Sequence, residues 1–349
     1  MTYTIEKVTT LIGARRYGDN DTNIGFILTD SRSLCFPEET LFFALKSERN
    51  DGHNYIPELY RRGVKNFVVT DVPKGYASDY PEANFLKVVN TLEALQRLAE
   101  RHRDEFNIPI VGITGSNGKT MVKEWLYQLL SPSMFVTRSP RSYNSQIGVP
   151  LSVWLMNEQT QVGVFEAGIS QPGEMLALRD IIQPTIAVLT NVGSAHQENF
   201  SSLEEKCREK LILFHDAETV VYDGDDEVIT KVVAEYPDYK GEKLFWSLQN
   251  PEAPFYVKKI EKQQSVSVIT YIYKGVEDSF SIPFIDDASI QNSIVCAAVA
   301  SKIGLSAEDI DKRMALLEPV AMRLEVKVGQ HGCTLINDSY NSDINSLDI

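Results

Sequence analysis

Long apolar runs are missing from the 349-residue sequence, so we expect no membrane-spanning helix, which would need about 20 consecutive apolar residues. The N-terminus also lacks the apolar core of a signal peptide. Cysteine is scarce, and Cys35, Cys207, Cys296 and Cys333 lie far apart without CxxC spacing. This spacing argues against a disulfide framework or a zinc site and favours reduced thiols. We therefore expect a soluble, cytoplasmic protein.

Positive charge is also in short supply. Lysine and arginine together number 34 against 48 aspartates and glutamates, a formal net charge of -14. Such a charge argues against general binding to nucleic acid or to a membrane surface, because both are polyanions. A phosphorylated small molecule is not excluded, because a local nest of backbone amides can attract it. The length fits two or three domains.

The first part of the chain alternates short β-type runs with helical ones. The runs at 41–45 and 66–70 read as strands, and apolar residues at helical spacing predict a helix over 91–106. Pro109, with a polar lead-in, then marks a boundary. We expect a small α/β domain over residues 1–106.

Strongly apolar strands alternating with helices begin at Ile110. Five such runs are IVGIT, FVTR, VGVFEAG, TIAVLTNV and TVVYDG. This pattern predicts a mostly parallel sheet with helices on both faces. Hairpin-like strands follow Trp246, and helices over 289–303 and 307–317 complete a central domain over 107–319. Two further strand-like runs indicate that 320–349 begins a third domain, and we expect the natural protein to continue beyond it.

The sharpest local signal is GITGSNGKT at 112–120, between a predicted strand and a predicted helix. A glycine-rich turn that opens a helix directs backbone amides at phosphate oxygens. Lys119 could then reach the β- and γ-phosphates, and the Thr120 hydroxyl could bind Mg²⁺. An ordinary strand-to-helix turn is the alternative. The expected nucleotide contacts are Thr114, Gly115, Ser116, Asn117, Gly118, Lys119 and Thr120.

TGSNGKT resembles the ATP loop of the Mur ligases and of the related folylpolyglutamate synthases. Later motifs agree in order: VFEAG carries Glu166 at the end of a buried strand, and TNVGSAHQ carries Asn191 and His196 after the next one. Ligands collect at the carboxyl ends of strands in open α/β sheets. The resemblance implies that Glu166 and His196 help hold magnesium, whereas His196 taken alone reads as a solvated loop residue.

Further residues complete the resemblance. Lys210 aligns with the lysine that Mur ligases carry as a carbamate, which would ligate a second Mg²⁺, although its lysine-rich helix also reads as a solvated face. Asn292 matches an adenine-contacting asparagine in a helix whose leading histidine and first asparagine are replaced here. Arg323 resembles an arginine that contacts the γ-phosphate, and Asp338 lies in a segment resembling the start of the third domain. The resemblance thus implies catalytic roles for Lys119, Lys210, His196 and Arg323.

The N-terminal segment resembles that of family members whose first domain binds a UDP-sugar. The residues carried over are Asp30, Ser31 and Arg32, although a DSR sequence can also form a purely structural Asx turn. YNSQIGVPLS, at 143–152, resembles the loop of the dipeptide-adding member, which implies that Asn144 faces the muramoyl peptide.

The resemblance therefore implies an ATP-dependent ligase that joins D-alanyl-D-alanine to UDP-N-acetylmuramoyl-tripeptide through an acyl phosphate, with ATP and two Mg²⁺ ions. In some bacteria such a ligase is fused to an alanine racemase, which remains open here. The alternatives are a diaminopimelate- or lysine-adding relative, a folylpolyglutamate synthase-like enzyme and a non-catalytic nucleotide-binding relative.

Overall fold

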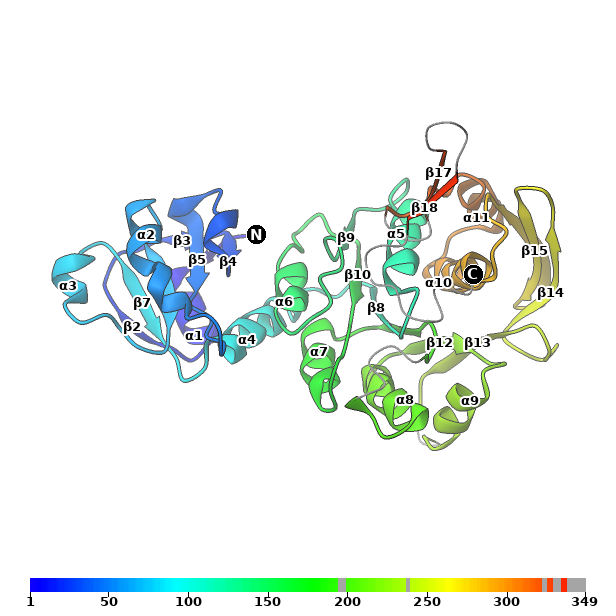
Figure 1. Ribbon diagram of the computed structural model, residues 1–349, viewed down its shortest axis with the longest axis horizontal. Coiled ribbons are helices and arrows are strands. Elements are labelled where there is room, and N and C mark those ends of the chain that lie inside the picture. The colour runs from blue at the N-terminus through cyan, green and yellow to red at the C-terminus, as the bar shows by residue number, and fades with distance from the viewer. Residues whose placement is uncertain (194–198, 237–238, 322–324, 329–333, 338–349) are drawn as a thin grey trace. The chain divides into compact units, whose positions relative to one another are not determined.

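The structure is a computed structural model that describes residues 1–193, 199–236, 239–321, 325–328 and 334–337 (Figure 1). Contacts divide the chain into two compact units. The N-terminal unit comprises Met1–Asn107 with Gln146–Glu158, and the central unit comprises Ile108–Ser145 with Gln159–Ile349. The grouping of Gln146–Glu158 with the N-terminal unit has no counterpart in the sequence pattern. The division into 1–106, 107–319 and 320–349 stays a prediction.

The N-terminal unit is built on a five-stranded sheet of order β2-β7-β6-β5-β4, in which only β2 runs antiparallel to its neighbour. Its strands are β2 (Arg15–Tyr17), β7 (Asn84–Lys87), β6 (Asn66–Val69), β5 (Thr40–Phe43) and β4 (Phe26–Leu28). The short strands β1 (Tyr3–Thr4) and β3 (Asn23–Ile24) form a separate antiparallel pair. Its helices are α1 (Ile5–Leu11), α2 (Ile56–Arg61), α3 (Tyr76–Asp79), α4 (Thr91–Arg103) and α6 (Gly148–Val153).

Helix α4 holds the Gln146–Glu158 segment in this unit. It begins after Asn90, whose side-chain oxygen accepts hydrogen bonds from the Leu92 and Glu93 amides, and it ends at Arg103, short of the predicted Phe106. The buried His102 ring makes a 3.1 Å hydrogen bond from Nε2 to the Met156 carbonyl. Burial lowers the pKa of His102 to about 4, so the ring is neutral at physiological pH.

The central unit is built on a nine-stranded sheet of order β16-β15-β14-β13-β12-β11-β8-β10-β9. Its parallel strands are β9 (Val136–Arg138), β10 (Val162–Glu166), β8 (Ile110–Thr114), β11 (Ile186–Leu189), β12 (Thr219–Asp223), β13 (Glu242–Ser247) and β14 (Phe255–Lys262). The antiparallel strands β15 (Ser267–Tyr273) and β16 (Val276–Ile282) extend one edge. The predicted mostly parallel sheet is confirmed.

Helices cover both faces of this sheet. One side carries α5 (Lys119–Leu130), α10 (Asp287–Ile303) and α11 (Ala307–Met314), and the other carries α7 (Glu174–Ile182), α8 (Leu203–Leu211) and α9 (Glu227–Ala234) (Figure 1). Buried apolar residues of α5, α10 and α11 form one cluster with the strands. This burial on both faces explains why the strands read as continuous apolar runs.

Two further strands, β17 (Glu325–Val328) and β18 (Thr334–Asn337), pair antiparallel after the last helix. In the described ranges no helix is both long and apolar enough to span a bilayer. The strands that position the candidate site are β10, β8 and β11, which lie side by side and parallel. Because their carboxyl ends meet at one edge, the segments after Thr114, Glu166 and Leu189 come together there.

Candidate nucleotide site

The glycine-rich loop joins β8 to α5, and two of its glycines are required by close contacts. Gly115 has φ +146°, and a β-carbon there would lie 1.9 Å from Thr190 Oγ1. Gly118 caps α5 with φ +80°, and a β-carbon there would lie 2.4 Å from Asn292 Oδ1. Neither position can accept a side chain without displacing a neighbour. The unusual glycine spacing therefore matches a specific backbone path.

The segment after β11 holds this loop in place. The Asn191 carbonyl accepts a hydrogen bond from the Ser116 amide at 3.0 Å, and Asn191 Oδ1 accepts one from the Asn117 amide at 2.9 Å. The Gly193 amide donates to Ser116 Oγ at 2.8 Å. Asn191 therefore acts on the loop backbone, which gives the TN sequence after β11 a clear structural role.

Lys119 begins α5 and folds back over the loop. Its Nζ donates hydrogen bonds to the Gly115 carbonyl at 2.7 Å and to the Ser116 carbonyl at 3.1 Å. The ammonium group is thus held at the mouth of the turn, where a helix N-terminus also directs its positive end. This arrangement suits the binding of phosphate oxygens.

Glu166 is fully buried at the end of β10 and faces the loop helix. Its Oε2 accepts hydrogen bonds from Thr120 Oγ1 at 3.1 Å and from Asn144 Nδ2 at 3.4 Å. Ser142 Oγ lies 3.2 Å from Thr120 Oγ1. The sequence predicted Thr120 and Glu166 at one metal site, and the structure brings their oxygens together.

The oxygen donors of this cluster fit Mg²⁺, which prefers hydroxyl, carboxylate and water oxygens. Glu166 Oε2 faces the Thr120 hydroxyl and is the carboxylate oxygen that fits the ion, whereas Oε1, which is buried and has no hydrogen bond in the described part of the chain, lies 3.1 Å from the Lys123 ammonium group. No group of three or more histidine, cysteine or acidic side chains placed to hold a metal occurs among those residues. Three predicted residues of the site, His196, Arg323 and Asp338, lie outside the described residues.

Lys123 is the site residue that the sequence analysis missed. It lies on α5, its side chain is 0 % exposed, and its Nζ is 3.1 Å from Glu166 Oε1. The contact between Lys123 Nζ and Glu166 Oε1 is an ion pair and not a hydrogen bond. The signal available in the sequence was spacing, since a residue three positions after Thr120 lies on the same face of the helix.

Lys210, on α8, is buried rather than solvated, as is Lys206 one turn before it. Burial lowers the pKa of Lys210 well below its usual value, and the nearby ammonium groups of Lys119 and Lys206 lower it further. The causes of this pKa shift are burial and charged neighbours, with no hydrogen bond among them. The reading of this helix as a solvated face is therefore wrong for these two lysines, and an uncharged amine is favoured at position 210.

Asn292 and Asn144 both contact glycines of the site. Asn292, on α10, is 7 % exposed and packs on Gly118, so the structure places it beside the phosphate loop. The Asn144 carbonyl accepts a hydrogen bond from the Gly168 amide at 2.8 Å, and its side chain would be 2.9 Å from a β-carbon on Gly168. Its contact explains the glycine of the EAG sequence. The adenine role of Asn292 stays a prediction.

The DSR residues of the N-terminal unit form an Asx turn. Asp30 Oδ1 accepts the Arg32 amide at 3.0 Å, and Asp30 Oδ2 pairs with an Arg32 guanidinium nitrogen at 2.6 Å. Hydrogen bonds from Arg32 lower the pKa of Asp30 to about 2. The Ser31 carbonyl accepts a hydrogen bond from Arg62 at 2.8 Å. The Arg32 side chain is 86 % exposed.

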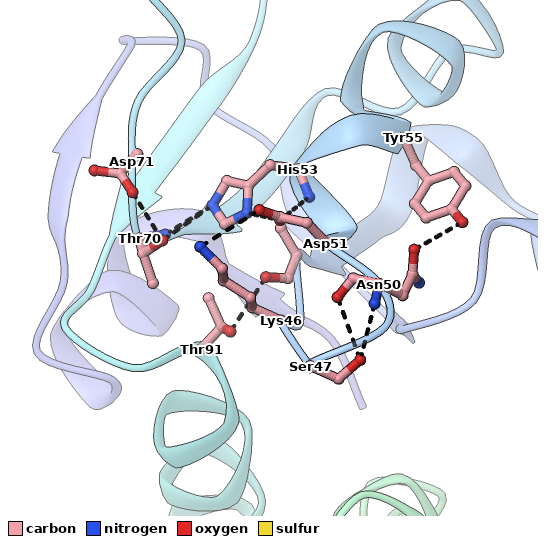
Figure 2. Close-up of polar contacts among 10 residues, drawn as sticks. Lys46, Ser47, Asn50, Asp51, His53, Tyr55, Thr70, Asp71 and Thr91 are labelled. Atoms are coloured by element: carbon pink, nitrogen blue, oxygen red, sulfur yellow. Dashed lines mark hydrogen bonds and ion pairs between the residues drawn. The ribbon is translucent and has the colours of Figure 1, made fainter.

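Figure 2 shows a second polar cluster in this unit, with the His53 ring between Asp51 and Thr70. The Thr70 amide donates to His53 Nε2 at 3.1 Å, so the proton of the neutral ring lies on Nδ1 and is donated to Asp51 Oδ1 at 2.6 Å. Gly52 is required here, because a β-carbon would lie 2.7 Å from the Ala44 carbonyl carbon. These contacts fix the loop between Ala44 and Gly52, which follows β5 at the carboxyl edge of the sheet.

Comparison with known families decides the relationship. Residues 113–300, more than half of the chain, match the Mur ligase middle domain. The chain belongs to the Mur ligase family. Residues 23–103 of this Mur ligase also match the Mur ligase family catalytic domain.

Individual relatives agree with this family. The UDP-N-acetylmuramoyl-tripeptide–D-alanyl-D-alanine ligase of Bacillus subtilis is 29% identical over 333 residues, covering 93% of this Mur ligase and 69% of the relative. The crystal structure of MurF from Acinetobacter baumannii has a TM-score of 0.90 at 24% identity and covers 100% of this chain and 75% of that one. The MurF ligase of Thermotoga maritima, in complex with ADP, has a TM-score of 0.79 at 25% identity, covering 92% and 72%.

Proposed function

We propose that this Mur ligase joins D-alanyl-D-alanine to UDP-N-acetylmuramoyl-tripeptide at the expense of ATP, in the cytoplasm. The observation that carries the proposal is the meeting of the glycine loop, Glu166 and the buried Lys210 in one unit whose fold is that of a Mur ligase. The named relatives that cover most of the chain add the substrate assignment.

The phosphates of ATP would lie against the loop at 114–120. Backbone amides and Lys119 would bind them, with Arg323 at the γ-phosphate and Asn292 and Asp338 in further nucleotide contacts. Thr120, Glu166 and His196 would hold Mg²⁺, and Lys210, as a carbamate, would hold a second ion. Bound magnesium supplies positive charge that offsets the charge developing during phosphoryl transfer.

The uncharged form of Lys210 makes the carbamate chemically sensible. A neutral amine adds carbon dioxide and releases a proton, which turns a cation into a carboxylate. Lys119 and Lys206 carry the nearby ammonium groups that lower the Lys210 pKa, and the negative charge of a carbamate at position 210 would be attracted to both of them. The carbamate would give the buried Lys210 side chain a function as a metal ligand, which a lysine cation could not perform.

The reaction then proceeds by two displacements. The terminal carboxylate of the tripeptide attacks the γ-phosphorus, the bond to ADP breaks, and an acyl phosphate forms. The amine of D-alanyl-D-alanine attacks the acyl carbon, a proton is lost from nitrogen, and inorganic phosphate leaves from the tetrahedral intermediate. The protein contributes orientation and charge compensation rather than a covalent bond.

Asp30, Ser31 and Arg32 would contact the UDP-sugar, and Asn144 would contact the muramoyl peptide. We also propose that residues 320–349 form the start of a third domain.

The deciding experiment measures phosphate release from ATP in the presence of one of several amines and either UDP-N-acetylmuramoyl-tripeptide or the acceptor that lacks its third residue. The 349-residue chain and any longer natural form would be assayed in parallel, because the chain spans about 69% of the Bacillus relative. Release that depends on D-alanyl-D-alanine supports the proposal. Dependence on a free diamino acid would assign another Mur ligase activity instead, and nucleotide binding with no amine-dependent release would indicate a non-catalytic relative.

A further inference from the structure

Lys123 is a buried ammonium group that the proposed chemistry leaves without a role. Its side chain is 0 % exposed on α5, one turn beyond the phosphate loop. A lysine is rarely buried completely unless its charge is paired. We therefore expect the charge of Lys123 to be paired and to have a specific role at this position.

Three oxygen groups surround Lys123 Nζ, and they come from three different segments. Glu124 Oε1 lies at 3.0 Å on the same helix, Glu166 Oε1 lies at 3.1 Å at the end of β10, and the Arg141 carbonyl accepts a hydrogen bond. The ammonium group therefore links the loop helix, the buried carboxylate and the 141–144 segment.

The pairing also determines which oxygen of Glu166 faces the hydroxyl cluster. Lys123 occupies the side of Oε1, whereas Oε2 accepts the hydrogen bond from Thr120. A carboxylate that bridges two groups in this way has a fixed plane, as carboxylates beside metal sites commonly do.

The 141–144 segment depends on the same ammonium group. Arg141 has φ +49°, a left-handed conformation that is unfavourable for a residue with a side chain. Its carbonyl is the acceptor of the Lys123 hydrogen bond, and Ser142 and Asn144, which follow it, contact Thr120 and Glu166. Holding the Arg141 carbonyl thus helps hold the two polar side chains beyond it.

We propose that Lys123 is a positioning residue that fixes the Glu166 carboxylate and the 141–144 segment relative to the phosphate loop, so that Mg²⁺ and nucleotide bind together. The inference rests on the proposed function for its metal and nucleotide, but the fixing of the segment is a property of the free protein. It goes beyond the sequence-predicted site, which did not include Lys123.

The test compares Lys123→Met with Leu129→Ala. Methionine keeps much of the side-chain volume but removes the charge and donors. Leu129 is a fully buried residue of the same helix within the apolar cluster, so its variant reports the effect of destabilising α5. Lys123→Arg serves as the charge-conserving variant.

The first readout is amide hydrogen exchange without nucleotide. We expect Lys123→Met to raise exchange at Tyr143 and Gly168, whose amides are hydrogen-bonded to Pro140 and Asn144, at least ten-fold relative to Leu129→Ala. Equal exchange in the two variants would overturn the inference, whatever the enzyme's activity.

The second readout is nucleotide affinity, measured by calorimetry with Mg²⁺ and with chelator. We expect Lys123→Met to lose at least ten-fold of the Mg²⁺-dependent enhancement of ATP binding, Lys123→Arg to retain part of it and Leu129→Ala to retain all of it. If Lys123→Met binds ATP with Mg²⁺ as tightly as the parent or more tightly, the ammonium group only compensates charge and the inference is wrong. A parent without any Mg²⁺-dependent binding would contradict the proposed function, while the exchange comparison would still decide the structural half.

Discussion

Thr190 Oγ1 occupies the space that a side chain on Gly115 would need, because a β-carbon there would lie only 1.9 Å from it. The same hydroxyl donates a hydrogen bond to the Asn117 carbonyl at 2.5 Å. The contact is therefore part of the scaffold that shapes the loop, and a change at Gly115 disturbs that scaffold directly.

We accordingly expect Gly115→Ala to weaken ATP binding at least ten-fold, because both the left-handed backbone and the clash with Thr190 displace the loop. Calorimetric titration with ATP and Mg²⁺ measures the effect. Gly275→Ala is the matched control, since Gly275 has φ +77° but nothing within 4 Å of the added carbon. That variant should lose about 1 kcal/mol of stability from backbone strain and bind ATP normally; parental ATP affinity in Gly115→Ala would contradict the structure of the loop.

The sequence was informative where a local pattern carries the signal. Buried parallel strands were recognised as apolar runs. The loop was recognised by its glycines before a helix, and Glu166 by its charge at the end of an apolar strand. The predicted ends of helices were less accurate: α11 ends at Met314 rather than Leu317, because the Leu316 and Leu317 amides donate to carbonyls three residues back, as in the tight last turn of many helices.

Tertiary burial is what the sequence could not supply. Lysine is a residue type that usually lies at the surface, and only the packing of α5 and α8 buries Lys123, Lys206 and Lys210. The grouping of Gln146–Glu158 with the N-terminal unit likewise depends on contacts with α4 that are distant in sequence.

Lys210 should make the stability of the protein depend on pH. Its folded-state pKa lies well below the usual 10.5, so between those two values the unfolded chain binds the additional proton and stability rises with pH. Below the pKa of folded Lys210, both states are protonated, and the free energy of unfolding is reduced by the full cost of burying the ammonium group. We therefore expect Lys210→Met to be more stable than the parent at pH 7 in CO₂-free buffer, with the difference shrinking as the pH approaches 10.5.

Urea unfolding at a series of pH values measures this difference. Lys231→Met is the control, because Lys231 is 65 % exposed and its ion pair with Glu204 lies at the surface. Its difference from the parent should vary little over the same range. A Lys210→Met variant that is less stable than the parent at pH 7 would show that the amine is favourably paired, against the geometry found here.

His53 should stabilise the loop that follows β5. His53→Phe keeps a ring but leaves the Thr70 amide without its acceptor, which costs about 1–3 kcal/mol for a partly buried group. It also removes the imidazole donor to Asp51, which still accepts the backbone amide of residue 53. Hydrogen exchange of the Thr70 amide measures the local loss of protection. The same substitution at His215, whose ring is 68 % exposed beside Asp216, should change stability by less than about 0.5 kcal/mol. Unchanged protection at Thr70 would mean that the His53 hydrogen bonds drawn in Figure 2 do not stabilise this loop.

Substitution of Arg32 distinguishes a purely structural role of the DSR sequence from a role in substrate binding. Its side chain is 86 % exposed, and its ion pair with Asp30 is screened by water, so Arg32→Ala should change stability by less than about 0.5 kcal/mol. The Asx turn itself survives, because the backbone amide of residue 32, which also donates to the Asp30 carboxylate, is still present in the variant. If the guanidinium group binds the UDP-sugar, the KM for UDP-N-acetylmuramoyl-tripeptide should rise at least ten-fold while the affinity for ATP stays constant. Arg61→Ala, another exposed arginine of the same unit, should leave both constants unchanged. A normal KM in Arg32→Ala would leave the DSR sequence with its structural role alone.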